Sequence, residues 1–223
     1  MKHQYYNKPK HTQIKIQISI AGTALLVLLI SLAISWLLHF YIIAFLALPI
    51  VISIIAPFFD VPSLKKSGKI VYYSSLFLTE QPKNNIMKVH GGSLFDYVYV
   101  LNFSMNGKQR TSLIIQQYLE GLLNLIEHYN NGTLKNYTIK GTSYIINKRT
   151  AKKIGFDIVE TNFIDSLVLI YNFPNILLSN SISKNRFSIP KLHNINTYQT
   201  DLEKLSAKKE YISALNIRLK RNI

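Results

Sequence analysis

An uncharged run near the N-terminus constrains this chain more than any other feature. Residues 16–59 include no Asp, Glu, Lys or Arg, and the first acidic residue of the chain is Asp60. The run has about twice the ~20 residues that one helix needs to cross a ~30 Å hydrocarbon core. A single crossing cannot use that length. The run therefore predicts two membrane-spanning helices that fold back on each other.

Aromatic residues mark the expected turn between the two helices. The aliphatic sequence is interrupted at its middle by Trp36, His39, Phe40 and Tyr41. Aromatic side chains of this kind favour the headgroup layer of a bilayer. We therefore expect one span at about 16–38 and a second at about 41–59, joined by a tight turn.

A secretory signal peptide is the alternative interpretation of the run. The apolar core of a signal peptide covers only ~7–15 residues and is followed by a cleavage site and a polar chain. Here the first apolar stretch alone is longer than that and leads directly into the second. The pattern favours a transmembrane hairpin.

Lysines on both sides of the run predict its orientation. They are Lys2, Lys8, Lys10 and Lys15 in the leader 1–15, and Lys65, Lys66 and Lys69 after the second span. The positive-inside rule places both basic flanks, and so both termini, in the cytoplasm. We expect a multi-pass protein of the bacterial inner (cytoplasmic) membrane, in which Lys65, Lys66 and Lys69 contact lipid headgroups.

The rest of the chain is basic and free of cysteine. Lys and Arg number 26 against 11 Asp and Glu, for a formal net charge of +15. Such a charge attracts polyanions, here anionic headgroups or nucleic acid. No nucleic-acid-reading motif accompanies the charge, so we expect no specific nucleic-acid partner. The lack of Cys excludes disulfides, thiol catalysis and zinc sites built on Cys.

After a juxtamembrane linker at 60–68, residues 69–223 predict a cytoplasmic α+β domain. The patterns indicate strands at 69–79, 86–90, 94–103, 137–146 and 156–159, an amphipathic helix at 111–129 and a short basic helix at 150–154. We expect 163–182 to form a buried or interfacial helix broken before Pro174, because Asp165 and Asn172 make a third crossing expensive. Strands and helices in this order are typical of an α+β fold.

The chain is expected to end in an amphipathic helix at 201–221. Thr200 and Glu203 have the spacing of a capping box. The apolar stripe consists of Leu202, Leu205, Ile212, Leu215 and Leu219. This stripe is a candidate surface for a protein partner or for self-association.

One short cluster has residue types that suggest catalysis. His90 and Ser93 flank Gly91 and Gly92, and Asp96 follows. The imidazole offers a base, the hydroxyl a nucleophile, and the glycines allow close backbone approach to an anion. The alternative is a strand end followed by a turn, which we favour because neither a nucleophile elbow nor a phosphate loop is present.

A basic cluster is the candidate anion-binding or headgroup-binding site. It consists of Lys148, Arg149, Lys152 and Lys153. The alternative is a solvated helix face, which explains the same residues. His90, His128 and His193 lack metal-ligand spacing, so we expect neither a metal nor a cofactor.

Two functions remain open from the sequence. The first is a non-enzymatic interaction or scaffold module, anchored in the membrane, that contacts anionic lipid or a protein partner. The alternative is a membrane-bound enzyme acting on a phosphorylated or lipid-linked substrate. In that case His90, Ser93 and Asp96 would do the chemistry, and Arg149 with Lys152 would hold the anion.

Overall fold

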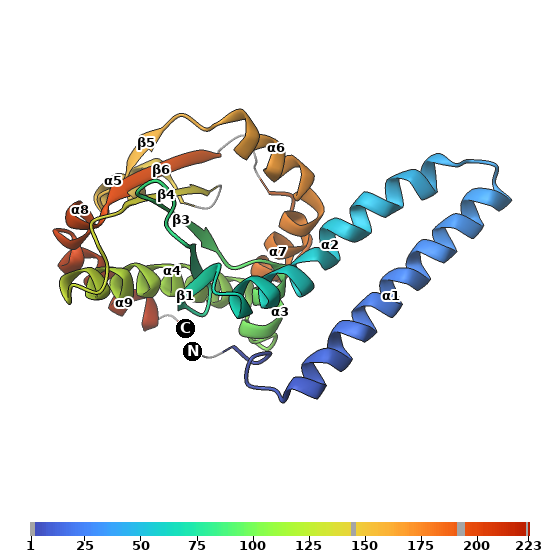
Figure 1. Ribbon diagram of the computed structural model, residues 1–223, viewed down its shortest axis with the longest axis horizontal. Helices are drawn as coiled ribbons and strands as arrows, with labels where there is room; N and C mark the ends of the chain where they lie inside the picture. Colours follow the sequence, from blue (N-terminus) through green and yellow to red (C-terminus); the bar gives the residue numbers. More distant parts are fainter. Residues whose placement is uncertain (1–2, 144–145, 191–194, 222) are drawn as a thin grey trace.

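Two long apolar helices precede a mixed α+β domain in the computed structural model, which describes residues 3–143, 146–190, 195–221 and 223. Helix α1 (Lys10–Leu37) and helix α2 (Ile42–Lys66) form a hairpin that projects from the domain (Figure 1). Both are long and apolar enough to cross a membrane. Helix α2 continues through most of the segment that the sequence assigns to a linker.

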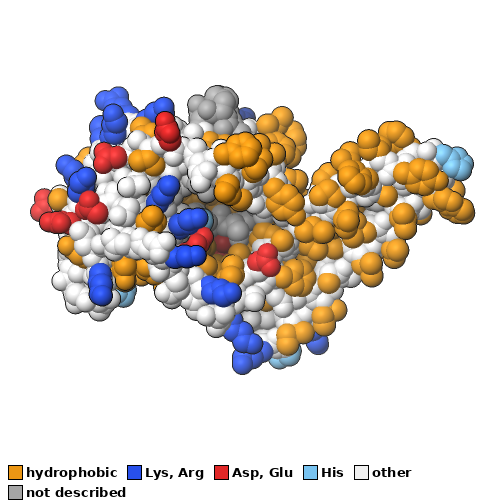
Figure 2. Space-filling view, turned by 45° about the horizontal axis from the view of Figure 1, so that its top comes forward, with side chains coloured by type: hydrophobic (Ala, Val, Ile, Leu, Met, Phe, Trp, Pro, Cys, Tyr) orange, Lys and Arg blue, Asp and Glu red, His pale blue; other side chains and the backbone are white. Residues whose placement is uncertain are grey.

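The hairpin buries very little of its apolar surface within the chain. In the most apolar stretches, 11% of α1 and 6% of α2 is buried. The core helix of a soluble protein is mostly buried, so these helices are not part of a soluble core. Figure 2 shows hydrophobic side chains covering the hairpin, whereas Lys and Arg gather over the domain.

Polar groups join the two helices where the backbone needs partners. At the turn, the Ser35 hydroxyl donates to the Phe40 carbonyl at 2.8 Å, and His39 adopts a left-handed conformation with φ 52°. Pro62 lacks the N–H that would bond the Phe58 carbonyl four residues earlier. The Gln17 side-chain amide on α1 donates to that carbonyl at 3.1 Å. The proline is thus compensated by the neighbouring helix.

A six-stranded sheet forms the centre of the domain. Its strands are β1 (Ile70–Ser74), β2 (Phe77–Glu80), β3 (Ile86–Gly91), β4 (Thr138–Ser143), β5 (Asp157–Val159) and β6 (Asn196–Asp201). The spatial order is β1-β2-β3-β4-β6-β5. All neighbours are antiparallel except β3 and β4, which are parallel.

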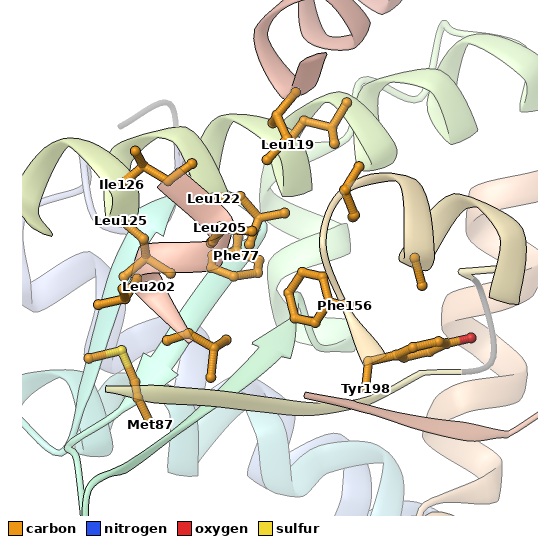
Figure 3. Close-up of a cluster of buried hydrophobic side chains, with 14 residues drawn as sticks. Phe77, Met87, Leu119, Leu122, Leu125, Ile126, Phe156, Tyr198, Leu202 and Leu205 are labelled. Carbon is orange, nitrogen blue, oxygen red and sulfur yellow. The ribbon is translucent and has the colours of Figure 1, made fainter. Parts of the chain in front are cut away.

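Helices cover the sheet and connect it to the hairpin. They are α3 (Leu94–Val100), α4 (Gly107–Asn130), α5 (Lys148–Lys153), α6 (Phe163–Tyr171), α7 (Phe173–Lys184), α8 (Leu202–Ser206) and α9 (Lys209–Lys220). Helix α4 lies along the sheet, and α6 and α7 lie at the side nearest the hairpin (Figure 1). Phe77, Leu122 and Phe156 gather beneath α4 in the main core, together with Tyr198 of β6 (Figure 3).

Several sequence predictions are confirmed by these elements. The amphipathic helix expected at 111–129 is the centre of α4. The basic helix expected near 150–154 is α5, which is followed by Gly155 at φ 97°. The break expected before Pro174 occurs at Asn172, between α6 and α7. Residues 144–145 of the strand expected at 137–146 lie outside the described residues.

Two of the predicted strands were wrong in detail. Residues 94–103 form no strand, because Ser93 and Asp96 make a capping box that starts α3 and overrides the β-preference of its Tyr and Val residues. The segment 69–79 makes two strands, since Gln117 of α4 bonds Ser74 and the Ser75 amide at an intervening turn.

The C-terminal helix differs from its prediction in both its start and its continuity. It is divided into α8 and α9, and the capping residue is Asp201, whose carboxylate accepts from the Lys204 amide at 2.7 Å. The Thr200 hydroxyl donates instead to the Gly155 carbonyl at 2.7 Å. The stripe residues Leu202, Leu205 and Ile212 are fully buried in the core of the same chain.

Close packing at Gly121 provides a test of this core. A Cβ atom at this position of α4 would overlap the Phe77 ring. We expect Gly121→Ala to lower the free energy of unfolding by about 1–3 kcal/mol through overpacking. The measurement is the thermal midpoint of the full chain in mild detergent. Gly22→Ala in α1, which has open space around it, is the control and should leave the midpoint unchanged or slightly higher.

Candidate functional site

A large cavity lies between the sheet, the end of α2, and the α6–α7 pair. Its volume is about 810 Å³, within the ~300–1,000 Å³ typical of sites that bury small molecules. Residues from both the hairpin and the domain line it, so the cavity lies where the two parts pack together. Helix α2 contributes Ala56, Pro57, Asp60, Val61 and Leu64.

The inner part of the cavity is apolar because it reaches the main core. Phe77 of β2, Leu122 of α4 and Phe156 line it and also belong to the core cluster. Ala151 and Ile154, on the buried side of α5, line it as well. Figure 3 shows Phe77 and Phe156 directed into the space between α4 and the sheet. This part can receive hydrocarbon but offers little to a charged group.

The polar part of the wall holds a histidine–carboxylate pair. His90 Nε2 lies 2.7 Å from Glu80 Oε1, across the pairing of β2 with β3. The hydrogen bond from His90 holds the pKa of the Glu80 carboxyl below its ordinary value, against the opposing effect of burial. Asn175 and Ser179 of α7 add neutral hydrogen-bonding groups to the same wall.

The two glycines of the candidate catalytic cluster serve packing in this structure. A Cβ atom on Gly91 would overlap the hydroxyl of Tyr118, and one on Gly92 would press on Leu76. Burial chiefly raises the pKa of Tyr118, so the hydroxyl stays protonated at neutral pH. The glycines therefore let the end of β3 approach α4 closely.

Asp96 serves as a buried structural acceptor. Its Oδ2 accepts from the Ser93 amide at 2.7 Å and from the Ser93 hydroxyl at 2.9 Å, which completes the α3 cap. Its Oδ1 lies 2.5 Å from the Tyr72 hydroxyl and 3.2 Å from His3 Nε2. Of the candidate catalytic residues, His90 and Ser93 line the cavity, whereas Asp96 is fully buried outside its wall.

The partners of Asp96 form a docking cluster that sequence reasoning missed. The cluster consists of His3, Tyr6, Lys65, Tyr72 and Asp96. The Lys65 ammonium lies 3.4 Å from the centroid of the Tyr6 ring, and burial lowers the pKa of Lys65. Burial, and then the Asp96 carboxylate, raise the pKa of Tyr72, so its hydroxyl donates. Two adjacent tyrosines in a basic leader were the sole sequence signal.

The docking cluster fixes the N-terminal segment to the domain. The Gln4 amide also donates to the Tyr99 carbonyl at 3.1 Å, and Tyr5 packs edge-on to Phe95 with ring centroids 4.9 Å apart. His3 and Tyr5 are almost completely buried. The beginning of α1 and the end of α2 are thus held at the same side of the hairpin by one set of contacts.

The predicted basic residues occupy two separate places. Lys148, Arg149, Lys152 and Lys153 are exposed on α5, which lies on the side of the domain away from the hairpin (Figure 1). They do not line the cavity, although Ala151 and Ile154 beside them do. Near the hairpin, Lys66 is exposed, and Lys69 is exposed at the cavity wall.

Metal-ligand groupings are not found in the part of the chain that the structure describes. No three or more His, Cys, Asp or Glu side chains come together there in a way that could hold an ion. His128 bonds the hydroxyl of Thr133 at 3.0 Å. His193 lies outside the described residues.

The docking cluster yields a stability prediction. In Asp96→Asn, an amide nitrogen replaces one carboxylate oxygen and cannot accept the hydrogen bonds that this oxygen accepts. We expect the free energy of unfolding to fall by about 2–4 kcal/mol, read as a lower thermal midpoint in mild detergent. Asp157→Asn removes an exposed carboxylate paired with Lys204 and should change the midpoint little. Equal effects of the two substitutions would contradict a structural role for Asp96.

Comparison with known proteins gives no relative from which a function could be inferred. No protein-family model, no curated protein and no solved structure matches the chain. The function is therefore argued from two observations, the cavity at the boundary of hairpin and domain and the cluster that holds that boundary together.

Proposed function

We propose that this protein is a two-pass protein of the bacterial cytoplasmic membrane whose hairpin and α6 hold an interaction domain against the cytoplasmic leaflet. In this position the domain contacts lipid headgroups or a protein partner. The proposal rests on the contact between the α6–α7 junction and α2. The Ser53 hydroxyl donates to the Tyr171 carbonyl at 3.3 Å, and Ser53 is the buried residue of α2.

The position of Ser53 gives a depth for α6. Ser53 lies six residues before the expected cytoplasmic end of the second span, which corresponds to about 9 Å at 1.5 Å per residue. Helices that lie in the membrane interface bury their apolar faces ~5–10 Å below the headgroups. With nine residues, α6 spans about 13 Å and is too short for a third crossing. These dimensions support an interfacial helix.

The side chains of α6 suit that environment. Phe163, Ile164 and Ile170 expose 73%, 63% and 63% of their surface. An apolar patch of this kind on a soluble surface would favour aggregation or association. In the leaflet the same side chains meet hydrocarbon. Figure 2 shows that the apolar surface continues from the hairpin onto the adjoining part of the domain.

Charge supports the proposed orientation. Lys66 and Lys69 are exposed where α2 ends, at the level where anionic headgroups would lie. The N-terminal segment packs on the domain through the docking cluster, so both ends of the hairpin share one side. The α5 cluster faces away from the hairpin and remains a candidate surface for a different anionic partner.

The enzyme alternative has weaker support from the same geometry. The Ser93 hydroxyl donates to Asp96 within a helix cap, and Asp96 bonds His3 and Tyr72. The remaining pair, His90 and Glu80, lines the cavity, whereas the basic side chains of α5 that were expected to hold an anion do not. Self-association through the C-terminal helix stays a prediction, with Tyr211 and Ile217 as apolar side chains that α9 leaves exposed.

Reporter fusions test the topology. With both ends of the hairpin in the cytoplasm, a cytoplasm-active reporter fused after Ile223 should work, and a periplasm-active reporter there should be silent. A matched fusion placed after residue 39, within the hairpin turn, should give the reverse pattern. An active periplasmic reporter after Ile223 would overturn the proposed orientation.

Fluorescence labelling tests the depth of α6. Because the chain has no cysteine, Val168→Cys and Ala214→Cys each provide one labelling site, on α6 and on the exposed face of α9. An environment-sensitive fluorophore at position 168 should have a blue-shifted emission in lipid nanodiscs and be quenched by nitroxide-bearing lipids. The fluorophore at position 214 should keep the emission wavelength that it has in water and should not be quenched by these lipids. Equal spectra at both positions would remove α6 from the leaflet.

A further inference from the structure

The cavity is placed between two elements that the proposed function puts in the membrane. Ala56 and Pro57 of α2 line it and lie within the expected second span, about 3–5 Å from its cytoplasmic end. Leu169 and Asn172, at the α6–α7 junction, line the same cavity. The cavity wall on this side therefore lies at the depth of the acyl chains rather than in water.

The interior of the cavity matches a hydrocarbon chain. Phe77, Leu122 and Phe156 present apolar surface to a space of about 810 Å³. If such a space stayed empty, the side chains around it would lose their dispersion contacts. Hydrocarbon from the bilayer restores these contacts without exposing apolar surface to water. Because bilayer and cavity are similarly apolar, the tail alone gives little selectivity.

Selectivity must then come from the polar wall, which has two carboxylates and one lysine. Asp60 and Glu80 are acidic, whereas Lys69 is basic and His90 is bonded to Glu80. Asn175 and Ser179 of α7 supply neutral donors and acceptors. The share of acidic groups in this wall contrasts with the net charge of +15 of the whole chain. A wall with two carboxylates disfavours an anionic head and suits an uncharged or zwitterionic one.

From these observations we propose that the cavity binds a single-chain membrane amphiphile with an uncharged or zwitterionic head. The chain enters from the cytoplasmic leaflet between α2 and the α6–α7 junction and lies among the core side chains. The head stays near Asp60, Lys69 and the Glu80–His90 pair. This inference rests on the proposed function, because the ligand reaches the cavity from the leaflet that α6 contacts.

Photo-crosslinking of the full chain in nanodiscs tests the inference. One probe is a lysophosphatidylcholine with a diazirine near the end of its chain, and a second is a fatty acid with the same diazirine. We expect the zwitterionic probe to label peptides of α4 and α5 around Leu122 and Ala151. The fatty acid should label them about tenfold less, because its carboxylate meets Asp60 and Glu80.

Two matched substitutions distinguish labelling within the cavity from labelling by the lipid around the hairpin. Ala151→Phe places a ring in the cavity and should lower labelling of α4 by about tenfold, through lost space for roughly two methylene groups. Ala214→Phe makes the same change on the exposed face of α9 and should leave labelling unchanged. Ala56→Phe, at the membrane side of the cavity, gives the same readout if Ala151→Phe does not fold.

Each outcome decides one claim. Labels confined to the outward faces of α1, α2 and α6, insensitive to Ala151→Phe, would overturn the cavity as a binding site while leaving the membrane placement intact. Equal core labelling by the two probes would overturn the assignment of the head. Absence of labels from α1, α2 and α6 altogether would instead count against the proposed function itself.

Discussion

The buried carboxylate of Asp96 is the contact on which the rest of the arrangement depends. It joins the N-terminal segment through His3, the first strand through Tyr72 and the start of α3 through Ser93. A buried acceptor of this kind stabilises the folded state only when all of its hydrogen-bond donors are in place. Because these donors come from distant parts of the chain, their assembly fixes the direction in which the hairpin leaves the domain. In the proposed placement, that direction decides which face of the domain meets the membrane.

The proposed membrane placement rests on this orientation and on the contact of Ser53 with the α6–α7 junction. Only 11% of the most apolar stretch of α1 and 6% of that of α2 is buried, and α6 exposes a further apolar face beside the hairpin. A bilayer satisfies both at once, whereas water satisfies neither. The cavity lies between these elements, and its wall changes from core side chains to polar groups. The proposed role as a lipid-contacting module and the proposed amphiphile site are two consequences of the same geometry.

Local patterns predicted the parts of the fold that local physics decides. The uncharged run predicted two long apolar helices, and the spacing of apolar residues predicted α4. The break near Asn172 followed from Pro174. The strand expected at 94–103 was wrong because a cap of two side chains outweighed an alternating pattern. The C-terminal helix was expected to be capped by Thr200, but Asp201, at the end of β6, caps α8 instead.

The site was beyond such reasoning because it depends on long-range contacts. His3 and Asp96 are 93 residues apart, and Ser53 and Tyr171 are 118 apart. No spacing rule connects such residues. The cavity draws its wall from the hairpin, the sheet and helices α3 to α7, none of which has a binding motif. Of the clusters that did stand out in sequence, the glycines beside His90 serve packing, and the basic residues of α5 are exposed away from the cavity wall.

The proposed membrane placement depends on the depth of α6 along the hairpin, and one distance measures this depth. Spin labels at Leu38→Cys, in the hairpin turn, and at Val168→Cys, on α6, can be introduced into the cysteine-free chain and read by pulsed electron paramagnetic resonance in nanodiscs. With α6 beside the Ser53 level of α2, we expect a single narrow distance distribution. A broad distribution, or one centred at distances that place α6 beyond the end of α2, would contradict it.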